Sequence, residues 1–534
     1  MKLLALHSMG HDTGACLYDG GRLVMAMETE RLTRVKHDHH VSLAVEYVLR
    51  AAGVTAASID VLVFSTNVSA SLAQIPDLDA IQRRIKAGSL HVEARSHMLG
   101  DPLPCLVVAH EAAHAAVACH VASWPEGCLV LVNEGRGTFS RNACLRYAHG
   151  ALELIERDPL PWYGTGFGWS ALGYLLGFGY SPSVAGRVMA MAGHGTESPT
   201  ATALLGSIDR DVHHLPRERQ RHHIQPLVDY LDRHRDFGAR ADLVSSFQHL
   251  FSATVAEYCR DRLSRNGVDE LALSGGCALN LDANSVIRRE IAPRLAIPPN
   301  CNDAGQALGA AVYALQLHFG VRPEPFDVYR CGTPLDAREA QQAAADAGLR
   351  IIDGDPAAIA RRLAAGNVVA LAHGPAELGP RALGNRSLLA SASWAGMKLR
   401  VSERIKQREW FRPLACVLRE ETFGQIFPGE GLSPHMLFNF AMPPRLAPEA
   451  THVDGTSRVQ TVARTANPVL HAILEAYERE TGAVALINTS LNGPHRAIAL
   501  GPADVLDDFL ARDVDVFAFD GLMAARPEPA ARSA

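Results

Sequence analysis

The stretch Glu377-Leu-Gly-Pro-Arg-Ala-Leu-Gly-Asn-Arg-Ser387 combines two arginines and an asparagine with the turn-forming residues glycine and proline. The apolar run Val368–Ala372, just before it, predicts a buried strand. A buried strand that leads into a polar, glycine-rich loop is how α/β folds present backbone donors to an anionic ligand. Arg381 can hold a phosphate or carboxylate with its rigid fork of donors, although a solvated surface turn would look similar in sequence. The stretch therefore favours an α/β fold with an anion site.

Three further strings lie downstream of this stretch: Arg404-Ile-Lys-Gln-Arg-Glu-Trp-Phe-Arg-Pro413, Asp454-Gly-Thr-Ser-Arg-Val-Gln460 and Asn488-Thr-Ser-Leu-Asn492. Together with residues 379–387 they resemble the C-terminal half of the O-carbamoyltransferases of the NodU/CmcH family. Strings typical of that family are F-G-P-R-A-L-G-N-R-S, K-x-R-E-x-F-R-P and N-T-S-F-N. Here Leu378 and Leu491 stand where phenylalanine is common. The resemblance runs nearly end to end, from Leu6 to Val505.

The resemblance implies that residues 336–534 form a YrdC-like α/β domain that makes carbamoyl-adenylate. Arg381 and Lys406 are expected to be catalytic there. The residues expected to bind carbamoyl phosphate or ATP are Arg381, Asn385, Arg386, Lys406, Arg412, Arg458, Asn488, Ser490 and Arg496. Converging cations suit this chemistry, because phosphoryl transfer depends on charge neutralisation and positioning. If Lys406 and Arg412 were only a basic helix surface, the apolar pair Trp410-Phe411 between them would be a coincidence.

The N-terminal residues predict a strand at Lys2–His7 and a hairpin that turns at Asp19–Gly21. The polar turn His7–Gly14 between these strands has the phosphate-loop layout of actin-like ATPases, and the resemblance implies an actin-like (Kae1-like) domain over residues 1–330. Polar tips are common in hairpins, so the turn alone is weak evidence. With the resemblance, His11 and Asp12 are expected to be catalytic and to contact the nucleotide or the acceptor.

A dense run of charge, Glu28–Asp38, follows the hairpin directly. Such runs are usually solvated faces. This one resembles the family string E-E-R-F-T-R-x-K-H-D, which closes over the substrate side. His37 and Asp38 are therefore further candidates for function.

The alanine-rich segment His110–His120 predicts a helix with His110 and His114 on one face, where two imidazoles can bind one divalent metal. Such a pair is more often coincidental, but the strand predicted at Cys128–Val132 ends beside a carboxylate, Glu134. The family pattern is H-x-x-x-H followed by D-G-x-G. Glu134 fills the aspartate position with one extra methylene, so direct ligation by Glu134 stays open.

Asp303, in an Asp-Ala-Gly string, could be an ordinary helix cap, but the family places a metal-binding aspartate there. The expected metal set is thus His110, His114, Asp303 and, as an open case, Glu134. Imidazole and carboxylate suit several first-row metals. Iron(II) is the expected ion, with manganese or zinc as alternatives.

A strand predicted at Leu271–Ser274 leads into the turn Gly275-Gly276 and then into a helix. Amides at such a helix start suit phosphates, and glycine permits close approach. Gly275, Gly276, Asn280 and Asn284 are therefore the expected nucleotide-binding residues of the N-terminal domain. The proline-rich segment 320–334 predicts a linker between the two domains.

Length and composition are those of a globular chain with two to four domains: 534 residues, 48% hydrophobic and 20% charged. A net charge of −6 gives no support to a duplex-binding surface. The 10 cysteines form no CxxC pair, which favours reduced thiols and a cytoplasmic location. No run has the length of a signal peptide or a membrane helix, so neither is expected.

The family modifies nodulation factors, aminoglycosides, cephems and macrolide-type antibiotics. The resemblance thus implies an ATP-dependent O-carbamoyltransferase for a small-molecule natural product, as in antibiotic biosynthesis. Expected partners are carbamoyl phosphate, ATP with Mg²⁺ and a hydroxyl acceptor, with no nucleic acid or membrane, and the chain is expected as a monomer or homodimer. One alternative is a tRNA-modifying enzyme of the threonylcarbamoyl-adenosine type, which would favour a basic surface. Another is an actin-like ATPase, binding module or sugar kinase, for which the C-terminal arginines would be superfluous.

Overall fold

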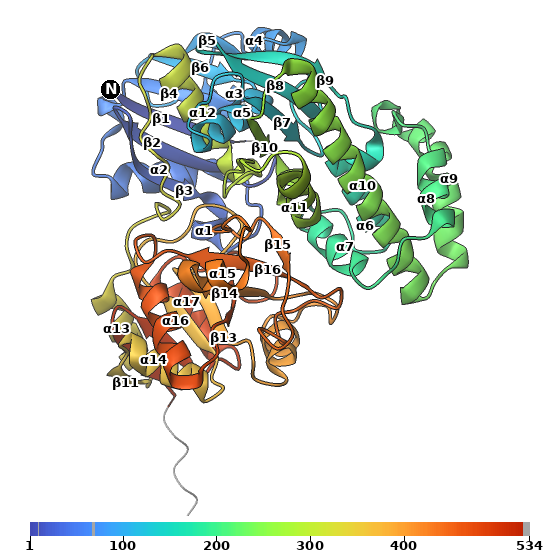
Figure 1. Ribbon diagram of the computed structural model, residues 1–534. Coiled ribbons are helices and arrows are strands. Elements are labelled where there is room, and N and C mark those ends of the chain that lie inside the picture. The colour runs from blue at the N-terminus through green and yellow to red at the C-terminus, as the bar shows by residue number, and fades with distance from the viewer. Residues whose placement is uncertain (9, 67–69, 527–534) are drawn as a thin grey trace, which may run out of the picture. The chain divides into compact units, whose positions relative to one another are not determined.

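The computed structural model describes residues 1–8, 10–66 and 70–526, and it confirms the predicted mixed α/β class (Figure 1). The chain forms two compact units. The first consists of Met1–Thr29 and His37–Asp327, and the second of Glu30–Lys36 and Val328–Ala534. The passage between Asp327 and Val328 falls inside the proline-rich segment 320–334. None of the helices within the described residues is long and apolar enough to cross a membrane.

The first unit contains two sheets. One has the strand order β3-β2-β1-β4-β6-β5 and the other β10-β7-β8-β9. Their strands are β1 (Lys2–His7), β2 (Gly14–Asp19), β3 (Arg22–Glu28), β4 (Val61–Ser65), β5 (His91–Ser96), β6 (Leu103–Val108), β7 (Leu129–Asn133), β8 (Asn142–Ala148), β9 (Ala151–Arg157) and β10 (Leu271–Ser274). In the first sheet β1 pairs antiparallel with β2 and parallel with β4, and in the second β10 pairs parallel with β7. The ends of β1, β7 and β10 carry the polar loops that the sequence singled out.

The helices of this unit cover its sheets and form a separate helical part (Figure 1). They are α2 (Val41–Ala51), α3 (Ala70–Ala73), α4 (Leu78–Ala87), α5 (His110–Val121), α6 (Gly166–Leu175), α7 (Ala185–Ala192), α8 (Pro199–Ser207), α9 (Arg217–Arg233), α10 (Phe237–Asn266), α11 (Leu281–Glu290) and α12 (Gln306–Tyr313). Residues 211–240 contribute α9 and the start of α10. Trp169 of α6 packs edge-on against Phe247 of α10.

Helix α5 is the structural centre of the first unit, because its residues from His110 to His120 are all buried. Its alanines allow α12 to cross very close by. A Cβ atom at Gly309 of α12 would lie only 2.1 Å from the Ala113 carbonyl oxygen, so the crossing requires glycine. The short 3-10 turn Asp303–Gly305 precedes α12 directly. The close crossing therefore fixes Asp303 against the histidines of α5.

The second unit is built on one mixed sheet with the order β11-β19-β18-β12-β13-β17-β14-β16-β15. Its strands are β11 (Arg350–Asp353), β12 (Val369–Ala372), β13 (Arg386–Ser391), β14 (Ala415–Arg419), β15 (Asn439–Ala441), β16 (Thr456–Val462), β17 (Leu486–Ser490), β18 (Val516–Phe519) and β19 (Leu522–Ala525). Its helices are α13 (Ala337–Asp346), α14 (Pro356–Ala364), η8 (a π-helix, Leu399–Ile405), α15 (Glu420–Ile426), α16 (Pro468–Thr481) and α17 (Pro502–Leu510). Leu363 of α14 and Ile473 of α16 share one apolar core with Leu389 of β13.

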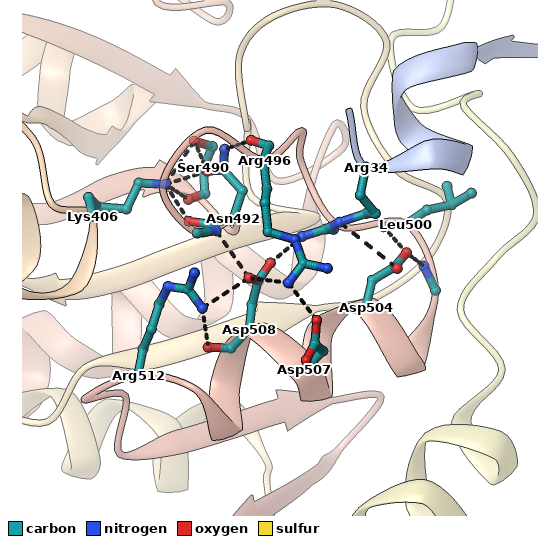
Figure 2. A network of polar contacts seen from close by, with 12 residues as sticks. Arg34, Lys406, Ser490, Asn492, Arg496, Leu500, Asp504, Asp507, Asp508 and Arg512 are labelled. Carbon is teal, nitrogen blue, oxygen red and sulfur yellow. Dashed lines mark hydrogen bonds and ion pairs between the residues drawn. The ribbon is translucent and has the colours of Figure 1, made fainter. Parts of the chain in front are cut away.

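Helix α1 (Thr29–Thr33) begins a segment, Glu30–Lys36, that belongs to the second unit although it lies near the N-terminus. Arg31 is fully buried and donates to the Gly379 carbonyl oxygen at 2.6 Å, inside the 377–387 stretch. Arg34 pairs with Asp508 of α17 (Figure 2). The Arg34 backbone oxygen accepts a hydrogen bond from Ala497 N at 3.0 Å. The segment is therefore an integral part of the second unit.

Replacing Arg34 with alanine should destabilise the second unit by about 1.5–3 kcal/mol, because it removes one charge-assisted hydrogen bond from the buried Asp508 carboxylate, which keeps Arg512 and Arg496 as partners. Arg34 and Asp508 side chains are only 8% and 4% exposed. Arg496→Ala is the matched control, since Arg496 contacts the same carboxylate at 3.5 Å but is 33% exposed. Hydrogen exchange of the α17 amides should be accelerated far more in the Arg34 variant. Equal exchange in the two variants would contradict this role.

Candidate functional site

Four side chains of the first unit converge on one point: His110 and His114 of α5, Glu134 after β7 and Asp303 before α12. His110 Nε2 and His114 Nε2 lie 3.3 Å and 3.4 Å from Asp303 Oδ1. His114 Nε2 also lies 3.2 Å from Glu134 Oε1. These are the four residues that the sequence predicted as a metal set, and the structure brings all four together in a buried position.

The spacing of these atoms suits a metal ion. Four ligands at about 2.0–2.1 Å from a metal stand about 3.3–3.4 Å apart at the corners of a tetrahedron. His110 Nε2, His114 Nε2 and Asp303 Oδ1 are buried, and none has a hydrogen-bond partner among the residues that the structure describes. Buried nitrogen and oxygen atoms without partners are costly, and a shared cation would satisfy them together. The residues present therefore fit a divalent metal.

A second layer of contacts holds these ligands in place. His114 Nδ1 lies 3.1 Å from the Ser274 hydroxyl of β10, which leaves Nε2 toward the cluster. Glu134 accepts a hydrogen bond from the backbone N–H of Gly276. Gly275 has φ +92°, and a Cβ there would lie 2.3 Å from the Asn133 carbonyl oxygen. The predicted phosphate turn thus packs directly against the end of β7 and helps to orient Glu134.

The electrostatics of the cluster call for a cation. Burial lowers the pKa of His114, but the carboxylates of Asp303 and Glu134 outweigh burial and raise this pKa to about 9. Burial raises the pKa of Asp303, whereas the neighbouring His110 and His114 hold it well below its ordinary value. His114 therefore keeps its proton at neutral pH beside the two carboxylates. A divalent metal can replace that proton.

The polar turn after β1 extends this cluster. His11 Nδ1 lies 3.1 Å from Asp12 Oδ2 and 3.7 Å from Asp303 Oδ2, so it links the turn to the metal set. Burial lowers the pKa of His11, but Asp12 and Asp303 raise it to about 9. Asp12 also receives a hydrogen bond from Asn302 at 3.0 Å, and His37 Nδ1 lies 2.6 Å from its other oxygen. The predicted catalytic pair His11 and Asp12 therefore lies beside the predicted metal set.

The predicted asparagines after the Gly275-Gly276 turn are committed to the protein framework. The Asn280 side chain caps α11 by accepting from Ala283 N at 3.0 Å, and it exchanges hydrogen bonds with Gln248. Asn284 donates to the Ala278 carbonyl oxygen at 2.8 Å. Both are buried, which differs from the expectation of side chains open to a nucleotide. The backbone N–H groups of the turn are used as well, since Gly275 donates to the Cys301 carbonyl oxygen at 2.7 Å and Gly276 to Glu134.

Cations gather in the second unit. Burial lowers the pKa of Arg458 far below its ordinary value, and the charges of Arg381, Arg408 and Arg412 add to this effect. Burial lowers the pKa of Arg408 to about 9, again with Arg412 and Arg381 contributing and Glu409 acting in the opposite direction. These charges act on one another, so the four arginines lie within electrostatic range of each other. The cluster of Arg381, Arg408, Arg412 and Arg458 is the arginine cluster of this protein.

One buried carboxylate shapes the loop that carries Arg381. Glu377 Oε1 accepts backbone hydrogen bonds from Leu383 and Asn385 at 2.7 Å each and from Arg386 at 3.2 Å. Three donors on one carboxylate oxygen curl the chain around it. Gln460 then ties the loop to β16 by donating to the Leu383 carbonyl oxygen at 2.8 Å. This arrangement holds the loop, and with it Arg381, in one conformation.

Several predicted ligand-binding residues belong to this framework. Arg386 is fully buried and donates to the carbonyl oxygens of Leu500 and His373 at 2.8 Å each. The Asn385 amide donates to the Pro375 carbonyl oxygen at 2.7 Å. Asn488 is also fully buried and donates to Gln460 at 2.6 Å. Their side chains are used within the protein, because the loop needs internal partners for its backbone groups.

The Lys406 side chain lies beside the end of β17, next to the predicted residue Ser490 and to Asn492 (Figure 2). Its ammonium group donates to the Ser490 hydroxyl at 3.2 Å and to the Asn492 carbonyl oxygen at 3.0 Å. Burial, together with the charges of Arg408 and Lys36, holds the pKa of Lys406 well below its ordinary value. Arg496 pairs with Asp507 and, at 3.5 Å, with Asp508. It therefore shares the Asp508 carboxylate with Arg34.

Comparison with known proteins follows the same division of the chain. Residues 2–77 and 93–312 match the model of the carbamoyltransferase N-terminus, and residues 360–526 match that of the carbamoyltransferase C-terminus. The chain belongs to the carbamoyltransferase family. The predicted family and the predicted enzyme class, a transferase of carbamoyl groups, are thereby confirmed.

This carbamoyltransferase is 28% identical over 535 residues to nodulation protein NolNO of Sinorhizobium fredii, which covers 95% of this chain and 77% of that protein. It is 39% identical over 241 residues to the 3'-hydroxymethylcephem-O-carbamoyltransferase of Streptomyces clavuligerus, covering 45% of each chain. Among solved structures, component A of (R)-2-hydroxyglutaryl-CoA dehydratase from Acidaminococcus fermentans is 13% identical, with a TM-score of 0.35, over 59% of this chain and 97% of that one. That likeness is too low to bear on function.

Two residues of the carbamoyltransferase sites were missed in the sequence. His7 ends β1 fully buried, with neither ring nitrogen hydrogen-bonded to a described residue, and its Nε2 lies 3.9 Å from Asp303 Oδ2. Burial lowers its pKa to about 4, so it stays neutral. Arg408 lies within the string 404–413 but was passed over in favour of Lys406 and Arg412. A histidine at the end of a buried strand was the available signal for His7.

Proposed function

We propose that this carbamoyltransferase uses ATP and carbamoyl phosphate to carbamoylate a hydroxyl group of a small-molecule natural product, as in antibiotic tailoring. The observation that carries the proposal is the arginine cluster. Guanidinium groups that lower one another's pKa are held against their mutual repulsion, and a polyanion would relieve it. Carbamoyl phosphate and the triphosphate of ATP are ligands of this kind.

The second unit would activate the donor. Water would hydrolyse carbamoyl phosphate to carbamate and phosphate. A carbamate oxygen would then attack the α-phosphorus of Mg²⁺-bound ATP, with pyrophosphate leaving and carbamoyl-adenylate remaining. Arg381 and Arg412 would bind phosphate oxygens and Arg408 and Arg458 would neutralise the charge that develops on them, since such clamps act chiefly by electrostatics. Lys406 and Ser490 would close one side of the site.

The first unit, proposed to be actin-like, would transfer the carbamoyl group. His110, His114, Glu134 and Asp303 would hold the divalent metal, with iron(II) as the expected ion and manganese or zinc as alternatives. When bound, that ion would supply Lewis-acid polarisation of an oxygen. Asp12 would orient His11 and His37 beside it.

A hydroxyl acceptor is supported by the Streptomyces clavuligerus relative, which is named as an O-carbamoyltransferase of a hydroxymethyl cephem. The test is incubation of the protein with ATP, Mg²⁺, carbamoyl phosphate and a panel of hydroxyl compounds that includes cephems, aminoglycosides and macrolides. Mass spectrometry should find a carbamate on one class, dependent on both ATP and carbamoyl phosphate. Transfer to tRNA in place of every small hydroxyl compound would overturn the proposal.

Arg381→Lys should raise the carbamoyl phosphate requirement about ten- to a hundred-fold, because lysine loses one charge-assisted hydrogen bond of a bidentate pair. Phosphate release at saturating ATP should show the change mainly in KM. Arg404→Lys is the control, an exposed arginine of η8 that lies outside the arginine cluster. An unchanged KM for Arg381→Lys would refute the assignment.

A further inference from the structure

A chain of three hydrogen-bonded side chains lies beside the metal set in the first unit. The hydroxyl of Ser183 lies 2.7 Å from His37 Nε2, and His37 Nδ1 lies 2.6 Å from Asp12 Oδ1. The three residues come from well-separated parts of the sequence: the turn after β1, the segment before α2 and the 3-10 turn Pro182–Val184 before α7. This order of contacts is that of a serine nucleophile, a histidine base and an orienting aspartate, an arrangement that recurs on unrelated folds.

The ionised state of Asp12 decides which atoms donate and which accept among Asp12, His37 and Ser183. Its pKa is lowered, because hydrogen bonds from His11 and His37 outweigh the effect of burial, so it is ionised and only accepts hydrogen bonds. The proton of a neutral His37 ring must therefore sit on Nδ1. Nε2 is then the acceptor of the Ser183 proton, as a general base requires.

The backbone is strained at the two residues that make the Asp12–His37 contact. Asp12 and His37 both have positive φ values, +56° and +61°, which non-glycine residues seldom adopt. Asn302 fixes the second oxygen of Asp12 by donating to it at 3.0 Å. Strained residues that are held by several partners are typical of sites that pre-organise chemistry.

The surroundings of Ser183 leave room for an acyl group. Ser183 is partly exposed, and its backbone N–H donates to the Ser181 hydroxyl at 3.3 Å. Helix α7 starts at Ala185, so the N–H groups of its first turn follow Ser183 directly and can serve an oxyanion. A Cβ at Gly186 would meet no atom within 4 Å, so this turn is open.

A hydroxyl that merely stabilises a loop would also contact a histidine, and the nearby His40 shows what a plain pair looks like. His40 Nδ1 lies 2.6 Å from Asp38 Oδ1, the same contact that His37 makes with Asp12. The His40 side chain is 61% exposed, whereas that of His37 is 23% exposed and hydrogen-bonded at both ring nitrogens. The His37–Asp12 pair therefore belongs to the candidate site, and the exposed His40–Asp38 pair serves as its control.

We propose that Ser183 is a nucleophile activated by His37 and Asp12 and that it carries the carbamoyl group as an O-carbamoyl ester. Ser183 Oγ attacks the carbamoyl carbon, and its proton passes to His37 Nε2. The bond to the leaving group then breaks with the electron pair going to that group, and His37 gives its extra proton to the leaving group or to water, which returns the ring to its neutral form. The acceptor hydroxyl then attacks the ester carbon and gives its proton to His37, and Ser183 Oγ leaves and takes a proton back. The identity of the natural donor, carbamoyl-adenylate, rests on the proposed function; the nucleophile itself does not.

The test uses para-nitrophenyl carbamate, an activated carbamate that needs neither ATP nor carbamoyl phosphate. The intact protein should release nitrophenolate in a burst and gain one carbamoyl group on the peptide that contains Ser183. Ser183→Ala should lose the adduct while keeping its thermal midpoint. His37→Asn should slow carbamoylation about 10²- to 10⁴-fold, the usual range for a general base. His40→Asn, the matched control, should react as the unaltered protein does.

Absence of the adduct from the Ser183 peptide, or equal rates for the His37 and His40 variants, would overturn the proposal. The reaction of carbamoyl phosphate with ATP, measured in parallel, reports on the proposed function separately. A protein that forms the adduct but consumes no carbamoyl phosphate would uphold the nucleophile and reject the proposed donor.

Discussion

Replacing His110 and His114 together with alanine should remove the bound metal and stop carbamoyl transfer, while the release of phosphate and pyrophosphate continues. Both histidines lie in the first unit, whereas the arginine cluster lies in the second. Loss of a single outer contact of a metal ligand costs about 10–100-fold, so loss of two ligands should reduce transfer more than about a hundredfold. Elemental analysis and separate assays of phosphate, pyrophosphate and carbamate product measure the three effects.

His120→Ala is the matched control for this variant. His120 lies on the same helix and is also buried, but it is not part of the metal set. The control should keep both metal and transfer. Equal metal content in the double variant and the unaltered protein would refute the metal site. If the folded double variant also stopped releasing phosphate, the two units would not divide the reaction as proposed.

Arg408→Met should lower donor activation about 10²- to 10³-fold, the usual cost of removing one group that stabilises transition-state charge. The fold should not suffer. Burial and the charges of Arg412 and Arg381 already lower the pKa of Arg408, so removing its charge relieves repulsion while the methionine keeps its apolar stem. We therefore expect an unchanged or higher thermal midpoint together with lost pyrophosphate release.

Synthetic carbamoyl-adenylate separates a lost activation step from a lost transfer step in this variant. Supplying it should restore transfer in Arg408→Met, because the first unit is intact. Arg404→Met, a change at an exposed arginine of the same segment, should leave all activities unchanged. A lower thermal midpoint and no rescue in Arg408→Met would mean that Arg408 stabilises the fold rather than the reaction.

Local signals in the sequence predicted much of this architecture. The pair His110 and His114 was readable because alanine density fixes a helix and the helical spacing fixes a face. The Gly275-Gly276 turn was found because strand ends and helix starts carry characteristic residues, whereas Asp303 was assigned to the metal set only through the family resemblance. The mixed α/β class followed from the alternation of buried strands with helices, as the sheets confirm.

Contacts between distant parts of the chain were not readable in this way. The segment Glu30–Lys36 looks like a solvated run of charge, yet Arg31 and Arg34 are buried in the second unit because Gly379 and Asp508 offer them partners. Residues can be separated by hundreds of positions, and a single sequence carries no record of such pairs. For the same reason Glu377 could not be recognised as the residue that shapes the loop, and Ser183 could not be connected with His37.

Carbamoyl-phosphate-dependent formation of pyrophosphate by the unaltered protein tests the central claim most directly. With ATP and Mg²⁺ present, the account predicts equal amounts of phosphate and pyrophosphate, none of either without carbamoyl phosphate, and an adenylate that can be trapped when the acceptor is withheld. Pyrophosphate release that requires threonine instead of carbamoyl phosphate, or ATP hydrolysis to ADP that is indifferent to carbamoyl phosphate, would contradict it.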